Sequence, residues 1–162
     1  MAEVDAKSIS LFFFFALLDE ARAVEATTAA IKNYKQRISK NPETKGAIAT
    51  VAATYQIWDQ NRNRFVRGRH NFNSDSGWQF PENLELGAWK EFQKTTQEDE
   101  FLALIWSQIL KISDEDISLG LGISIGTLRY RTGRALRKLG QLTHPVSTRP
   151  NNTAKIGLVK SE

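Results

Sequence analysis

Two helix-start signals stand close together in the last third of this chain, with a glycine between them. Ser113 is followed by the acidic run Asp114 to Asp116, which is the pattern of a helix N-cap and a negatively charged first turn. Ser124 has the features of a second N-cap, and Gly122 stands where a left-handed residue would end the first helix. This spacing predicts a short helix, a tight turn and a second helix, which is a helix-turn-helix.

The second helix, predicted over residues 125–139, separates into two sides when it is wound at about 100° per residue. The side predicted to face the core holds Leu128, Thr132, Ala135, Leu136 and Leu139. The other side and its flanks hold Gly126, Arg129, Tyr130, Arg131, Gly133, Arg134, Arg137 and Lys138. Because no acid stands four residues from any of these arginines, we favour a helix that lies against phosphates and base edges over an ordinary solvated helix.

Acidic and basic residues are also separated along the last third of the chain. The sequence has 22 Lys and Arg against 18 Asp and Glu, a net charge of +4. Residues 97–124 contain six acids and one base, whereas residues 125–162 contain eight bases and one acid. A basic block directly after an acidic one predicts a polyanionic partner for the last third of the chain.

Residues 111–142 resemble region four of bacterial RNA polymerase sigma factors, in which a helix-turn-helix reads the upstream promoter hexamer. The matching pieces are Ser-Asp-Glu-Asp-Ile (113–117), Leu-Gly-Ile-Ser (121–124), Gly-Thr-Leu (126–128) and Arg-Ala-Leu-Arg-Lys-Leu (134–139). The resemblance covers less than a third of the chain. It implies a protein of transcription that binds double-stranded promoter DNA and contacts the RNA polymerase core, with an anti-sigma or activator protein as a further partner.

The resemblance also implies a set of DNA-binding residues in and just before the second helix. Those that would face the major groove are Arg129, Tyr130, Gly133 and Arg134. Those that would approach phosphate at the start of the helix are Ser124 and Thr127. Those at the basic end, near DNA backbone or an activator, are Arg137 and Lys138. The apolar face of residues 101–110 corresponds to the surface that docks on the polymerase flap in family members.

The rest of the chain is also predicted to be helical. Apolar residues at three- and four-residue steps from Phe13 to Ile38 predict one long amphipathic helix. The run Asn41 to Glu43 predicts the N-cap and first turn of a second helix, which ends at Gly68. A short helix near residues 88–94 and a third substantial one over residues 98–110 precede the helix-turn-helix.

The expected fold is therefore all-α. An N-terminal helical pair (1–67) is followed by an irregular linker (68–87) that is rich in Gly, Asn, Ser and Asp. A C-terminal domain of three or four helices (88–142) comes next, and a tail (143–162) is expected to be disordered. Residues 1–67 do not align with sigma region two, so their role as a degenerate region two stays open.

Two groups of aromatic residues have alternative interpretations. Tyr55, Trp58 and Phe65 are interleaved with arginines, which suits stacking on single-stranded nucleic acid. They also share a helical stripe with Ile48 and Val51, and we favour the core on this ground. The run Phe12 to Phe15 covers every side of a helix, so a buried core and a partner's groove both stay open, with membrane-surface attachment the weakest alternative.

Catalytic and metal sites are not expected. The chain has no cysteine, and His70 and His144 stand far apart, which argues against structural zinc and thiol chemistry. Asp114 to Asp116 have no base, nucleophile or metal ligand near them in sequence, so we interpret them as capping residues. We expect no enzymatic activity and no cofactor.

We expect a cytoplasmic protein without a membrane partner. The apolar run at residues 9–18 is too short for a bilayer, which needs about twenty residues, and it lacks the flanks of a signal peptide. Two functions remain. The first is transcription initiation or regulation through promoter DNA and RNA polymerase. The second is a protein-interaction module, a sigma or anti-sigma partner that keeps the helix-turn-helix without binding DNA.

Overall fold

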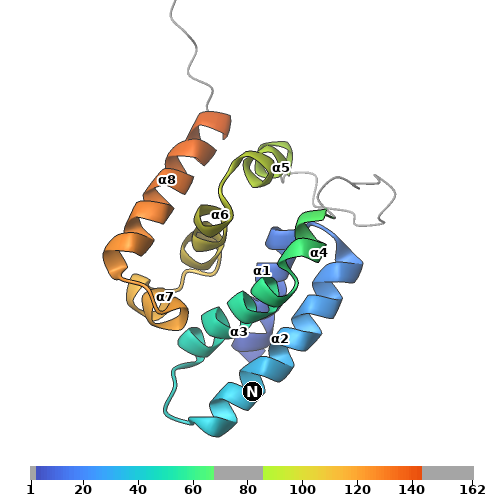
Figure 1. Ribbon diagram of the computed structural model, residues 1–162, viewed down its shortest axis with the longest axis vertical. Coiled ribbons are helices and arrows are strands. Elements are labelled where there is room, and N and C mark those ends of the chain that lie inside the picture. Colours follow the sequence, from blue (N-terminus) through green and yellow to red (C-terminus); the bar gives the residue numbers. More distant parts are fainter. Residues whose placement is uncertain (1–2, 68–85, 144–162) are drawn as a thin grey trace, which may run out of the picture.

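The computed structural model describes residues 3–67 and 86–143 of the chain. Within these ranges the protein is all-α, as predicted, with eight α-helices, one π-helical turn and no strand (Figure 1). The elements are α1 (Glu3–Leu17), α2 (Glu20–Lys40), α3 (Gly46–Gln60), α4 (Arg62–Arg67), α5 (Leu86–Thr95), α6 (Glu98–Leu104), the π-turn η2 (Ile105–Ile109), α7 (Asp114–Leu121) and α8 (Ile125–Thr143).

The prediction of one long helix near the N-terminus is wrong, because the chain reverses between α1 and α2. Leu18 adopts a left-handed conformation with φ of 51°. Asp19 then caps α2 by accepting a hydrogen bond from the Arg22 amide at 2.9 Å. The two helices lie side by side (Figure 1). An aspartate N-cap interrupts the apolar stripe here, and the stripe alone does not reveal it.

The predicted start of the second helix is also wrong. Asn41 is the C-cap of α2, and its amide donates to the Arg37 carbonyl at 3.0 Å. The residues after it form a turn, in which the Thr44 amide donates to the Asn41 carbonyl at 3.1 Å, and α3 begins only at Gly46. A further break at Asn61 separates α3 from α4. The predicted N-terminal pair thus consists of four helices.

One buried core joins the N-terminal helices to the C-terminal ones. The Phe12 ring of α1 stacks on the Trp106 ring of η2, with centroids 5.1 Å apart and an interplanar angle of 16°. The Trp106 indole donates to the Thr54 hydroxyl of α3 at 3.0 Å, and the Trp89 indole of α5 donates to the Phe15 carbonyl at 2.9 Å. The proposed boundary near residues 68–87 therefore does not separate two cores.

Most of the predicted linker and tail lies outside the described residues. Leu86 and Gly87, assigned to the linker, belong to the first turn of α5, and Thr143 is the last residue of α8.

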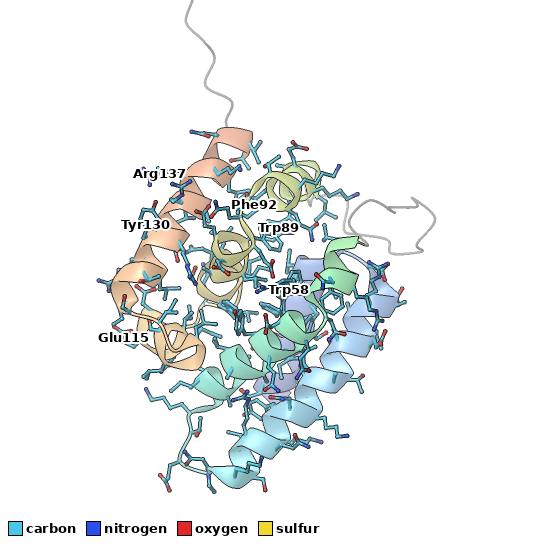
Figure 2. The ribbon with its side chains drawn as sticks, in the orientation of Figure 1. Trp58, Trp89, Phe92, Glu115, Tyr130 and Arg137 are labelled. Carbon is cyan, nitrogen blue, oxygen red and sulfur yellow. The ribbon has the colours of Figure 1, made fainter. Side chains whose placement is uncertain are left out.

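The N-terminal aromatic residues are mainly core. Phe12 and Phe13 are fully buried, and so are Trp58 and, nearly, Phe65. Figure 2 shows Trp58 inside the helical assembly. The core interpretation is confirmed for Trp58 and Phe65, and Tyr55 is partly buried against the same core. A stacking platform for single-stranded nucleic acid would need these rings at the surface.

Candidate nucleic-acid interface

The helix-turn-helix predicted from local signals is present. The Ser113 hydroxyl accepts a hydrogen bond from the Asp116 amide at 3.2 Å and caps α7. Gly122 ends α7 with a left-handed φ of 67°. The Ser124 hydroxyl accepts from the Thr127 amide at 3.1 Å at the start of α8. These interactions lie within a few residues of one another, which is why the sequence reveals them.

The buried side of α8 is narrower than predicted. Leu128, Thr132 and Ala135 are buried against the rest of the chain. Leu136, predicted to face the core, is 44% exposed. At 100° per residue it lies about 80° from Leu128, and the helices that cover α8 do not extend that far around it. The helix itself continues to Thr143.

The opposite side of α8 is accessible. Figure 2 shows Tyr130 and Arg137 on the outer side of the helix, away from α1 to α4. The predicted DNA-binding residues that are exposed are Ser124, Thr127, Arg129, Tyr130, Arg134 and Arg137. A Cβ added at Gly133 meets nothing within 4 Å, so there is open space beside this position.

Acids from other helices pair with three of the arginines of α8, although no acid stands four residues from them in the sequence. The first turns of α6 and α7 are acidic and lie beside α8. The ion pairs are Arg129 Nε to Asp114 Oδ2 at 2.9 Å, Arg131 Nη2 to Asp99 Oδ2 at 3.2 Å, and Arg134 Nε to Glu100 Oε1 at 2.7 Å. These pairs join residues far apart in sequence, which an inspection of positions four residues away cannot reveal.

These contacts stabilise the charged form of two of the arginines further. A hydrogen bond to the Tyr130 hydroxyl, together with the charge of Glu100, raises the pKa of Arg134. The hydrogen bond and charge of Asp114 raise the pKa of Arg129. The Arg129 side chain is 66% exposed, and Arg131, itself 27% exposed, pairs with an Asp99 side chain that is 47% exposed. Both are therefore surface ion pairs, and such pairs exchange partners at little cost.

The two cations near the C-terminal end of α8, Arg137 and Lys138, point in different directions. Arg137 is exposed, and its Nε donates to the Gly133 carbonyl of its own helix at 3.3 Å. Lys138 is half-buried, and its ammonium donates to the Thr95 carbonyl at the end of α5. A cation at this position satisfies a C-terminal carbonyl of α5. The structure therefore turns Lys138 toward α5 and away from the face that carries Tyr130.

Sequence reasoning missed the position at which the helix-turn-helix packs on the N-terminal helices. A Cβ added at Gly120 of α7 would stand 2.7 Å from the Val51 Cβ and 3.0 Å from the Ile48 carbonyl oxygen of α3. The two helices cross so closely that only glycine fits. A glycine inside a short helix is a sequence signal for such a contact, although it does not identify the partner.

The surface that the resemblance assigns to the polymerase flap is part of the protein interior. Phe101, Leu104 and Ile105 are at most 1% exposed and belong to the shared core. In this arrangement the apolar face of residues 101–110 is covered by the protein itself.

None of the described helices is long and apolar enough to cross a membrane.

The comparison with solved structures shows a fold similar to that of a sigma factor. No protein-family model matches the sequence, and no curated protein does. Among solved structures, the chain is similar to the sigma factor RpoE from Bartonella quintana, determined as a co-crystal with the anti-sigma factor NepR. The TM-score is 0.67 and the sequence identity 19%, over 88% of this chain and 93% of that one. The likeness therefore reaches well beyond the region-four-like segment and includes N-terminal helices.

Proposed function

We propose that this chain is a sigma-factor-like transcription protein that binds double-stranded promoter DNA through the outer face of α8 and contacts the RNA polymerase core. One observation carries this proposal: the chain has a fold similar to that of a sigma factor, and the outer face of α8 in its helix-turn-helix is accessible. Arg129, Tyr130 and Arg134 lie on that face.

Each group on the face has a distinct chemical role in this proposal. The N-terminus of α8 carries the positive end of the helix dipole, which favours a phosphate beside Ser124 and Thr127. Gly133 leaves room for the groove wall to approach. Arg134 and Tyr130 reach base edges, and Arg137 meets phosphate on the outside of the groove.

The test measures affinity for a pool of random-sequence duplex DNA at about 50 and about 200 mM salt. The proposal expects an affinity that falls linearly with salt on a log-log plot, because phosphate binding releases counterions. Arg137→Ala should weaken binding, whereas Lys35→Ala, which removes the same charge from the exposed side of α2, should not. Absence of duplex binding by the native chain at low salt would refute DNA recognition. Co-purification with core RNA polymerase tests the second part of the proposal.

A protein-interaction function is the second candidate, and a hollow beside the helix-turn-helix favours it. The hollow has a volume of about 360 Å³ and is lined by α2, α3 and α7. Arg37 and Lys40 stand on one side, and Leu119, which is 67% exposed, stands on the other. Exposed leucine beside cations suits an acidic, partly apolar protein segment. A stable complex with an anti-sigma protein, combined with no affinity for duplex DNA, would select this function.

A further inference from the structure

One of the three acids that face α8 differs from the others in burial. The Glu100 side chain is 8% exposed, whereas the neighbouring Asp99 side chain, in the same turn of α6, is 47% exposed. Both carboxylates pair with an arginine of α8, Glu100 with Arg134 and Asp99 with Arg131. Adjacent residues of one helix thus make the same kind of bond in two different environments.

Arg134 is held from two directions. Its Nε donates to the buried Glu100 carboxylate at 2.7 Å, and its Nη1 donates to the Tyr130 hydroxyl at 3.1 Å. The guanidinium carbon also lies 5.6 Å from the centroid of the Tyr130 ring. The buried Glu100 carboxylate and the Tyr130 hydroxyl together favour one orientation of the planar guanidinium, and a defined orientation of the fork is what bidentate recognition of a base edge requires.

The burial of each carboxylate determines whether DNA can replace its ion pair with an arginine. When Arg131 leaves Asp99 for a phosphate, the exposed carboxylate is rehydrated and little is lost. When Arg134 leaves Glu100, a carboxylate stays buried without its cation, which is costly. Arg134 therefore remains paired as α8 approaches DNA, and the pair carries no net charge.

We propose that Glu100 is a positioning residue for DNA recognition, which holds Arg134 beside Tyr130 so that the arginine selects bases and adds little to the salt-dependent attraction. This inference rests on the proposed function. It assigns sequence selection to the buried pair and salt-dependent affinity to arginines with exposed partners or none, such as Arg131 and Arg137.

The experiment compares Glu100→Gln with Asp99→Asn in the full chain. Each removes one negative charge from the same turn of α6 and keeps an oxygen that can accept a hydrogen bond. The native chain and both variants are mixed with a random-sequence duplex pool, and bound DNA is sequenced. Affinity for the selected and the unselected DNA is then measured at several salt concentrations.

For Glu100→Gln we expect the ratio of selected to unselected affinity to fall about tenfold and the salt slope to steepen by about one, since Arg134 becomes an unpaired and mobile cation. For Asp99→Asn we expect the ratio to stay at the native value. A merely structural role of Glu100 would lower the folded fraction, which reduces both affinities equally and leaves their ratio and the slope unchanged.

A native ratio and a native slope in Glu100→Gln overturn the inference. If that variant does not fold, Arg134→Lys takes its place. This variant keeps the positive charge at the exposed end of the pair and removes the planar guanidinium. It should therefore lose the same selectivity for sequence. Native selectivity in this variant overturns the inference. Failure of the proposed function is recognised separately, because the native chain would then bind no duplex at any salt concentration.

Discussion

Gly120 of α7 lies directly against Val51 of α3, so closely that a Cβ at position 120 would stand 2.7 Å from the Val51 Cβ. Val51 is fully buried in the middle of α3 and has no room to withdraw. Among the described glycines of the helix-turn-helix, Gly120 is the one that lies closest to the N-terminal helices.

Gly120→Ala should therefore destabilise the protein. The overpacked contact is expected to lower the free energy of unfolding by about 1–3 kcal/mol, more than the gain in helix propensity. Gly133→Ala is the matched control, because the same methyl group enters open space in the middle of α8. It should raise the free energy of unfolding by about 0.5–1 kcal/mol. Denaturant titration of both variants measures the two values, and equal signs would contradict the packing described at Gly120.

Gly133→Leu tests whether the outer face of α8 enters a groove. The leucine has space in the isolated protein, so the fold should persist, but the side chain would stand between α8 and any surface that approaches it. We expect specific DNA binding to be abolished while the circular dichroism spectrum stays native. Normal DNA binding by this variant would favour the protein-interaction function.

The two cations at the end of α8 should behave differently. Arg137→Ala should lower the affinity for all DNA sequences and reduce the salt slope by about one, as expected for a phosphate contact. Lys138→Ala should change the slope less, because the ammonium donates to the Thr95 carbonyl of α5. Salt titrations of both variants make the comparison. A larger change of slope for Lys138 would mean that this contact opens when DNA binds.

Much of this site could be predicted from the sequence, and the part that could not has a common cause. The caps at Ser113 and Ser124 and the turn at Gly122 are set by neighbours in the chain. The pairing of Arg134 with Glu100 depends on how α6 packs against α8. The break at Asp19 was missed because the apolar stripe continues on both sides of it. Local sequence patterns predict helices, caps and turns, whereas side-chain pairs between different helices can be identified only from the fold.

The C-terminal helices should not be stable alone, although the sequence pattern indicates a separate C-terminal domain. A fragment of residues 86–143 would expose Trp106, which stacks on Phe12 of α1, and would lose the hydrogen bond from Trp106 to Thr54. We expect thermal unfolding of the fragment to show no cooperative transition. Addition of a separate fragment of residues 1–67 should restore a cooperative transition. A fragment that unfolds cooperatively by itself would support the two-part division.

Alkaline pH should weaken the packing of α1 on α2. The Tyr34 hydroxyl donates to Asp5 Oδ2 at 2.7 Å, and burial together with this bond raises the pKa of Tyr34 to about 12. The folded-state value exceeds the ordinary value of 10.0, so the stabilising effect is complete below pH 10 and is lost as the pH rises toward 12. Between these values Tyr34→Phe should lose less stability with pH than the native chain. Parallel curves of stability against pH for the two proteins would contradict this assignment.

The ion pairs along α8 also determine how the protein would search for DNA. A cation beside a carboxylate presents a dipole to its surroundings, and the field of a dipole fades with distance faster than that of a single charge. Long-range steering, which accelerates encounters with a polyanion, would therefore be weaker than the number of arginines suggests. Association would be slow and only mildly dependent on salt, and the residence time on DNA would then set the affinity.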